Sequence, residues 1–274
     1  MRTFARAVWA FLLRDFQTET SYRLAFLLSA IGLFVSATVW YFMARFITGA
    51  SDPARLASQT GGLDYYSFAL VGLMVNRFLD VSLHSFSSSI RSEQATGTLE
   101  AMLVTPAKLG HLVLASSAYS YVYAGLQAAA YLFFGVLVFG VRMDLGSLIG
   151  AVLAVVLTSL ALSGIGVLSA GFVLYFKRGN PLDFVITSLS LLFGNVIIPQ
   201  QALPAQISWI SNLVPVYYAN NAVRGALLQG RDLATLAPDL LALLLFSAVL
   251  VPVGLFGARI AVRRAKQEGS LIQY

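Results

Sequence analysis

Long apolar segments are the feature that most restricts how this chain can fold. Six of them follow one another along the sequence, at residues 24–46, 65–86, 109–139, 148–176, 184–198 and 236–262. A transmembrane helix needs about 20 apolar residues, because each residue adds about 1.5 Å and the hydrocarbon core is about 30 Å thick. Charged residues make up only 11% of the chain, against roughly a quarter in soluble domains. The sequence therefore predicts a single all-α integral membrane domain, residues 1–274, with six transmembrane helices.

Residue types that carry catalysis or bind metals are sparse. The chain has no cysteine, and its two histidines, His84 and His111, are too far apart for a recognisable metal-binding pattern. We find no clustered acid, base and nucleophile of the kind that an intramembrane enzyme needs. The net charge of +6 comes from basic residues that flank apolar segments, not from the aromatic-rich basic patch typical of nucleic-acid binding. We expect no enzymatic activity, no metal site and no nucleic-acid partner, whereas membrane lipid surrounds the chain.

The flanking charges predict how the chain is oriented in the membrane. With the N-terminus inside, five basic residues fall on the outer side, namely Arg45, Arg55, Arg142, Arg224 and Arg231. Arg77 lies within a segment, and the remaining twelve fall on the cytoplasmic side, namely Arg2, Arg6, Arg14, Arg23, Arg91, Lys108, Lys177, Arg178, Arg259, Arg263, Arg264 and Lys266. Because cytoplasmic loops are enriched in Lys and Arg, both termini are predicted to be cytoplasmic. Tyr65 and Tyr66 are expected in an outer aromatic belt, with packing in the core as the alternative.

The N-terminal residues 1–20 precede the first apolar segment and have an amphipathic pattern. One helical face would collect the apolar residues Phe4, Val8, Phe11 and Leu12, and the other the polar residues Arg2, Arg6 and Gln17. This pattern predicts an interfacial helix that lies on the cytoplasmic leaflet. The alternative is the frayed beginning of the first span.

The segment 184–198 is too short for an ordinary span. Its 15 residues give about 22 Å of helix, less than the thickness of the hydrocarbon core. Pro199 is expected to end the helix, and we expect two further helical pieces, at 205–213 and 216–229. Broken helices at membrane depth occur where protein covers them or where they line a cavity. We therefore predict that residues 199–230 form a re-entrant hairpin near the outer mouth of a pathway. An ordinary outer loop with surface helices is the alternative.

Residues 91–106 form a polar insert between two apolar segments on the cytoplasmic side. Gly97 interrupts helical propensity, and Thr98 can cap a new helix start. Leu99, Met102 and Leu103 follow at the spacing of a short apolar stripe. A short amphipathic helix joined to two spans is suited to docking in a groove of another protein. A helix that lies on lipid headgroups explains the same pattern equally well.

The same insert carries a resemblance to a known family. Glu93, Gly97-Thr98-Leu99-Glu100, Leu103 and Thr105-Pro106 resemble the permease subunits of type-two ABC exporters, which move drugs, lipids or lipid-linked glycans out of bacteria. The segment from Leu203-Pro204 through Trp209 and Pro215 to Arg224 is similar to the same family, more weakly.

The resemblance implies that 91–106 is the coupling helix, which is seated in a cleft of a separate ATP-hydrolysing subunit. Its contact residues would be Arg91, Glu93, Gly97, Thr98, Leu99, Glu100, Met102, Leu103 and Pro106. The chain has no phosphate-binding G-x-x-x-x-G-K-[ST] loop, so ATP and Mg²⁺ would be bound by two copies of the partner ATPase. A second permease, most simply a second copy of this chain, would complete the transporter in the bacterial cytoplasmic membrane.

The second apolar segment contains polar residues, namely Asn76, Arg77, Asp80 and His84. Arg77 and Asp80 are three residues apart, close enough to pair on one helix. Ionisable groups within a span normally face the interior of a helix bundle or water. We interpret the four residues as a gate near the coupling helix, with a neutralised pair in a cytoplasmic extension of the span as the alternative.

Residues that line a translocation path are the least specific prediction. Ser188, Phe193 and Asn195 on the short fifth segment are candidates, with Phe34 and Tyr41 of the first span facing them across a dimer. Simple helix packing is the alternative, and small residues between Ser163 and Gly171 in the fourth segment also indicate close helix contacts.

The function expected from these features is export of an amphipathic or lipid-linked substrate, driven by ATP hydrolysis in the partner. An ion- or proton-coupled secondary transporter is the alternative, because such transporters place carboxylates or histidines within their spans. Whether the substrate is a drug, a lipid or a glycan stays open.

Overall fold

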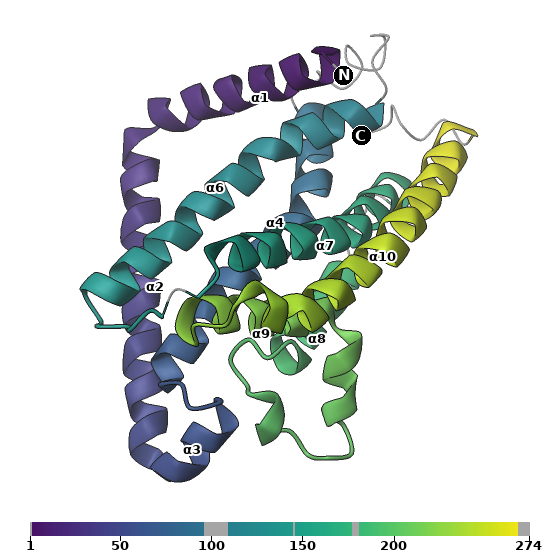
Figure 1. Ribbon diagram of the computed structural model, residues 1–274. Helices are drawn as coiled ribbons and strands as arrows, with labels where there is room; N and C mark the ends of the chain where they lie inside the picture. The colour runs from purple at the N-terminus through teal and green to yellow at the C-terminus, as the bar shows by residue number, and fades with distance from the viewer. Residues whose placement is uncertain (1, 96–108, 145, 177–180, 268–274) are drawn as a thin grey trace.

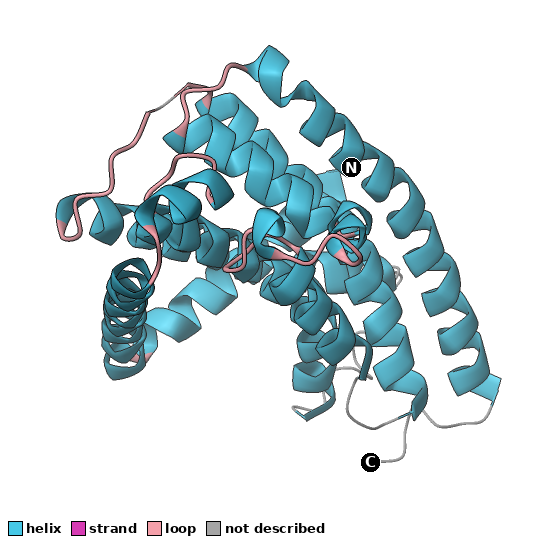
Figure 2. Ribbon diagram, turned by 90° about the horizontal axis from the view of Figure 1, so that it is seen from below, coloured by secondary structure: helices cyan, strands magenta, loops and turns pink. Residues whose placement is uncertain are grey.

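The protein is described by a computed structural model, in which residues 2–95, 109–144, 146–176 and 181–267 are placed. All regular secondary structure in these ranges is helical (Figure 2). The long helices are α1 (Arg2–Ser21), α2 (Arg23–Ala50), α4 (Tyr65–Ala95), α6 (Leu109–Leu137), α7 (Leu148–Phe176) and α10 (Leu233–Gln267). The shorter ones are α3 (Pro53–Gln59), α8 (Pro181–Phe193) and α9 (Pro215–Leu228), with 3₁₀ turns η1 (Gln200–Ala202) and η2 (Ser208–Leu213). The prediction of an all-α membrane protein is confirmed.

Five of the described helices are long and apolar enough to cross a membrane, namely Leu27–Ala50, Tyr65–Ser88, Ser117–Leu137, Leu148–Phe172 and Leu233–Ala261. The predicted fifth span is the exception, because α8 has only 13 residues. The N-terminal end of α1, the C-terminal ends of α4 and α10 and the beginning of α6 all lie at the upper end of the molecule in Figure 1. The end of α2, α3 and the segment between α8 and α9 lie at the opposite end.

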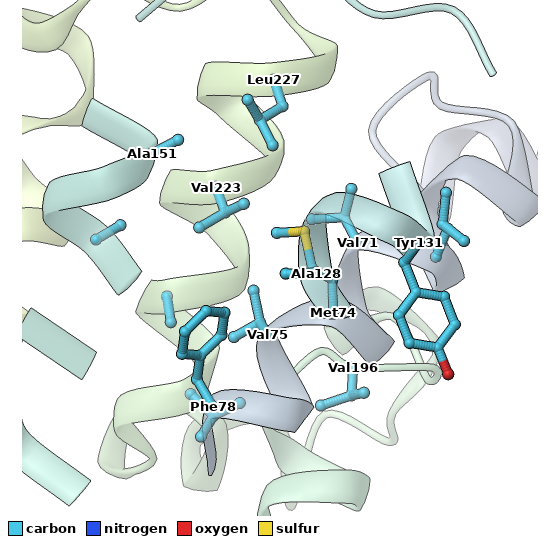
Figure 3. Packing of buried hydrophobic residues seen from close by; sticks show 14 of the residues in the cluster. Val71, Met74, Val75, Phe78, Ala128, Tyr131, Ala151, Val196, Val223 and Leu227 are labelled. Carbon is cyan, nitrogen blue, oxygen red and sulfur yellow. The ribbon is translucent and has the colours of Figure 1, made fainter. Parts of the chain in front are cut away.

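Helix α4 is the centre of the bundle. It packs against α2, α6, α7, α8 and α9, and 72% of its span is buried, compared with 11% for α2 and 17% for α10. In the core shown in Figure 3, Val71, Met74, Val75 and Phe78 of α4 lie beside residues of α6, α7 and α9. The exposed apolar faces of α2 and α10 are those available to lipid or to another membrane protein.

Helix α7 lies between α4 and α10, and its glycines permit the close approach. A Cβ atom on Gly166 would lie 1.9 Å from the carbonyl oxygen of Ser82 on α4. A Cβ atom on Gly164 would lie 2.4 Å from the carbonyl oxygen of Leu250 on α10. The small residues in this segment therefore bring the helix backbones together, as their spacing predicted.

Helix α1 turns sharply away from α2 at Tyr22 (Figure 1) and packs against α6. Of the residues predicted on its apolar face, Val8, Phe11 and Leu12 are half-buried, whereas Arg6 and Gln17 are exposed. Trp9, Leu13 and Phe16 form a second, exposed apolar stripe. The predicted apolar face thus meets α6, and the position of α1 at the membrane surface stays a prediction.

The end of the predicted fifth segment is wrong in detail. Helix α8 ends at Phe193, five residues before the predicted end at Ile198. Asn195 adopts a left-handed conformation with φ of 56°, which ends a right-handed helix. Of the two helical pieces expected after Pro199, the second is α9, and the first is a turn followed by η2.

Tyr65 and Tyr66 do not form an outer belt. They are only 6% and 4% exposed, and Tyr65 Oη donates to the carbonyl oxygen of Ile197 at 3.1 Å. Packing in the core, the alternative interpretation, is correct for this pair: Tyr65 bonds the segment after α8, and the ring of Tyr66 packs against the rings of Tyr41 and Phe139.

Asp232 caps the beginning of α10, outside the candidate span. Its carboxylate accepts from the backbone N–H of Thr235 at 3.0 Å and from the Thr235 hydroxyl, and these bonds hold the pKa of Asp232 below its usual range. A depressed pKa means that the cap stabilises the folded state above the ordinary value of 3.8 and is lost as the pH falls below it. Asp232→Asn keeps an acceptor but does not titrate. We therefore expect the melting-temperature difference between parent and Asp232→Asn to change below that pH and to be constant above it.

Candidate functional site

The predicted coupling residues lie at the end of α4 and beyond it. Arg91 and Glu93 are on the last turns of α4, and the residues from Gly97 to Pro106 are outside the described residues. Their contact with a partner therefore stays a prediction. The described structure shows what the segment joins: it connects the most buried span, α4, to α6, and α1 packs on α6.

A charged pair lies near the middle of the candidate span of α4. Arg77 Nη1 is 3.8 Å from Asp80 Oδ2, and the two side chains are 41% and 35% exposed. Both residues fall inside the candidate span Tyr65–Ser88. Partly exposed charges at this depth are costly in lipid. We infer that this face of α4 is covered by protein or water in the working molecule.

Two further polar atoms at this level are buried. Asn76 Oδ1 and Arg77 Nε have no hydrogen-bond partner among the described residues. Buried polar groups in proteins are nearly always hydrogen-bonded. Asn76 Oδ1 and Arg77 Nε are therefore exceptions, which the described residues enclose without a partner.

His84 extends this group of polar residues towards α7 and α8. Its Nδ1 is 2.9 Å from the carbonyl oxygen of Asp80, which can only accept, so Nδ1 carries the proton of this bond. Its Nε2 is 3.6 Å from Asp183 Oδ2 at the beginning of α8. The hydroxyl of Ser169 on α7 donates to Asp183 Oδ1 at 2.8 Å. Three helices are thereby tied together at one polar cluster.

Sequence reasoning found part of this cluster. It placed Arg77, Asp80 and His84 together, and the structure does bring them together with Asn76 beside them. It did not connect Asp183 or Ser169 with them. The signal for Asp183 was present, since an acidic residue in the first turn of an apolar helix complements the helix dipole.

Two aromatic candidates for a path, Phe34 and Tyr41, contact other aromatic rings of the chain. The ring of Phe34 lies 5.4 Å from that of Phe134, and the ring of Tyr41 lies 4.8 Å from that of Phe139 and 5.3 Å from that of Tyr66, between centroids. Phe34 is also 39% exposed, so the role of these two residues in a path stays a prediction. Ser188 and Phe193 on α8 are half-buried, and their role in a path stays a prediction.

Asn195, the remaining path candidate, has a structural role in the described chain. It is 8% exposed, its Nδ2 donates to Asn221 Oδ1 at 2.8 Å, and its Oδ1 accepts from the backbone N–H of Gln200 at 3.2 Å. Its side chain thus holds the turn between α8 and η1.

Arg224 is buried, which sequence reasoning did not foresee. The charge count assigned it to the outer side of the membrane, and on α9 it is only 3% exposed. Its guanidinium donates to the carbonyl oxygens of Phe68, Asn195 and Val196 at 2.6 to 3.0 Å. A basic residue between two predicted spans is normally a flanking charge at the membrane surface. The sequence around Arg224 gave no sign that its side chain is buried.

Comparison with known protein families gives a match over most of the chain. The family described as "ABC-2 type transporter" matches residues 4–228, which run from α1 to the last residue of α9. A search of curated proteins found no match.

Proposed function

Since the chain belongs to the ABC-2 type transporter family and is therefore a multi-pass transport permease, we propose that it exports its substrate with energy from a separate ATPase. The observation that carries this proposal is that α4 links a charged pair within its span to the predicted coupling segment. One helix contains the half-exposed Arg77–Asp80 pair within its span and ends at Ala95, directly before the predicted coupling segment.

The proposed path runs along the polar face of α4. Lipid cannot cover Arg77 and Asp80 without a large cost, so a second permease, most simply a second copy of this chain, faces them across a path. Phe184, Val185 and Leu189 of α8 are 75%, 50% and 41% exposed. The combination of charged and apolar surface is suited to an amphipathic or lipid-linked substrate.

The proposed cycle begins outside this chain. Two copies of the ATPase bind ATP and Mg²⁺ and approach each other, and residues 91–106 follow them. The displacement passes into α4 and opens the path towards the outer leaflet. With both termini in the cytoplasm of a bacterial cell, the direction is export across the cytoplasmic membrane.

The experiment that tests this function is co-purification of the partner ATPase with Leu103→Asp and Glu100→Arg variants. Both changes alter the short apolar stripe or its neighbouring charge and should release the ATPase or abolish substrate-stimulated ATP hydrolysis, because an unpaired charge in an apolar groove is strongly disfavoured. Gln206→Arg is the control, since Gln206 is exposed and belongs to the segment between α8 and α9, which lies at the other end of the molecule from the C-terminal end of α4 (Figure 1). Normal binding and hydrolysis by both variants contradict the proposal.

A second candidate function has a specific observation in its favour. His84, Asp80 and Asp183 form a cluster of titratable groups between α4 and α8, as a proton-coupled transporter requires. Transport that continues without ATP and stops when a protonophore collapses the proton gradient supports this alternative. Transport that requires ATP and survives the protonophore excludes it.

A further inference from the structure

Arg224 is a buried cation whose described partners are all neutral. Its four hydrogen bonds reach the carbonyl oxygens of Phe68 (3.0 and 2.7 Å), Asn195 (2.6 Å) and Val196 (2.8 Å). Its guanidinium carbon also lies 3.5 Å from the centroid of the Phe68 ring. Among the described residues no carboxylate pairs with it. Desolvating a charge in this way is costly. The hydrogen bonds to the carbonyl oxygens and the contact with the Phe68 ring must therefore offset that cost.

The contacts with Asn195 and Val196 complete the broken end of α8. Helix α8 ends at Phe193, and the carbonyl groups of residues 194–196 follow it in a turn, where they need donors from elsewhere in the chain. Here α9 supplies the donors: Asn220 Nδ2 bonds the carbonyl oxygen of Gly194 at 2.8 Å, and Arg224 bonds the next two. The planar guanidinium presents its N–H donors in a fixed fork, which the compact ammonium group of a lysine cannot reproduce.

The contact with Phe68 joins this broken end to α4. Phe68 is in the first turn of α4, and Gly72 follows one turn later. A Cβ atom on Gly72 would lie 2.0 Å from the carbonyl oxygen of Val196 and 2.7 Å from Arg224 Nη2. Only glycine lets α4 approach the turn so closely. Arg224 and Gly72 therefore hold α4, α9 and the end of α8 as one unit, which we call the Arg224 clamp.

The other end of α4 leads to the predicted coupling segment. Helix α4 has 31 residues and is about 46 Å long at about 1.5 Å per residue. A continuous helix moves as a rod, so a displacement at Ala95 also moves Phe68. Whatever is bonded to Phe68 must follow or break its bonds.

We propose that Arg224 is a positioning residue that makes the outer segment, residues 194–214, move together with α4 during transport. The inference rests on the proposed function, because it assumes that an ATPase displaces the coupling segment. It adds that the displacement reaches the outer mouth through the Arg224 clamp.

The first test uses the chain together with its partner ATPase, reconstituted in lipid vesicles. The chain has no cysteine, so Ala205→Cys gives one label site, on the exposed outer segment. The measurement is its rate of labelling with a membrane-impermeant maleimide in the nucleotide-free and the vanadate-trapped states. We expect the parent to show different rates in the two states. Arg224→Lys and Gly72→Ala should lose this difference while they still bind the ATPase and hydrolyse ATP.

Gly125→Ala is the matched control, because a Cβ atom at Gly125 meets nothing within 4 Å. It should keep the difference between the two states. A preserved difference in Arg224→Lys and Gly72→Ala overturns the inference, and so does equal labelling of the parent in both states. In either case, ATPase binding that is lost with Leu103→Asp still supports the proposed function, so failures of the two proposals are distinguishable.

A second measurement needs no variant of the clamp. Ser88 is exposed on α4, near its coupling end, and Ala205 is on the outer segment. Spin labels on Ser88→Cys and Ala205→Cys within one chain should keep the same distance in the nucleotide-free and the trapped states. A distance that changes between the states shows that the outer segment moves independently of α4 and overturns the inference, even if the clamp variants fail to fold.

Discussion

Replacing Gly254 with alanine should destabilise the membrane domain more than any other single added methyl group on α10. A Cβ atom at this position would lie 1.8 Å from the carbonyl oxygen of Gly164 and 2.9 Å from its Cα atom. Both atoms are backbone, so no side chain can rotate away. The two helices must separate, and α10 packs along α7.

The expected cost follows from how membrane helices associate. Lipid tails are as apolar as the side chains, so close packing between helices supplies much of the stability. Overpacking a well-filled contact costs about 1–3 kcal/mol, which exceeds the helix propensity of about 1 kcal/mol that alanine gains over glycine. The measurement is the melting temperature of the purified protein in detergent, together with the amount recovered from membranes.

Gly125→Ala and Gly32→Ala are the controls for this prediction. Both add the same methyl group to a long helix, but nothing lies within 4 Å of the added atom. They should melt at or above the temperature of the parent. A Gly254→Ala protein that melts with the controls shows that α7 and α10 are not in backbone contact there.

Reversing one charge of the Arg77–Asp80 pair is expected to have the second-largest effect. Arg77→Asp leaves two carboxylates three residues apart within the span, and Asp80→Arg leaves two guanidinium groups. An unpaired charge in the centre of a span costs about 2.5–3.5 kcal/mol on insertion scales. Each single variant should therefore accumulate poorly in membranes and melt early.

The double variant, Arg77→Asp with Asp80→Arg, restores one charge of each sign at the two positions, whose side chains are 3.8 Å apart in the parent. It should recover much of the membrane level and melting temperature that each single change loses. Arg55→Asp, on the exposed part of α3 outside the spans, is the control for a change of charge alone. If the double variant is no better than the single ones, Arg77 and Asp80 do not act as a pair.

The apolar segments predicted where the long helices lie more accurately than where they end. Helix α7 occupies residues 148–176, the segment that its apolar run predicted. The predicted ends of the first and last spans, 46 and 262, fall short of the helix ends at Ala50 and Gln267. The positions of the spans could be predicted because a bilayer imposes a local rule: about 20 apolar residues, with every backbone group bonded inside the helix. This rule does not determine how far a helix continues beyond the membrane.

The site divides in the same way. Arg77, Asp80 and His84 lie within two turns of one helix, so helical spacing alone placed them together. Asp183 and Ser169 belong to other helices, and only packing brings them to His84. The coupling residues 97–106 were predicted from their own sequence. Co-purification of the partner ATPase with the Leu103→Asp and Glu100→Arg variants tests that prediction.

By itself, the sequence determined that this chain is a helical membrane transport permease, because span length and a family motif are both written in short stretches of residues. The tertiary structure decided where α8 ends, that Arg224 is buried and which helices Gly164 and Gly166 face. Val196, Ile197 and Ile198 are apolar enough to continue a helix. They do not continue it: Asn195 adopts a left-handed conformation with φ of 56°, and side chains of α9, more than twenty residues later, bond the carbonyl oxygens of residues 194–196 in this turn. Such bonds depend on which backbones approach each other, and that is a property of the packed molecule.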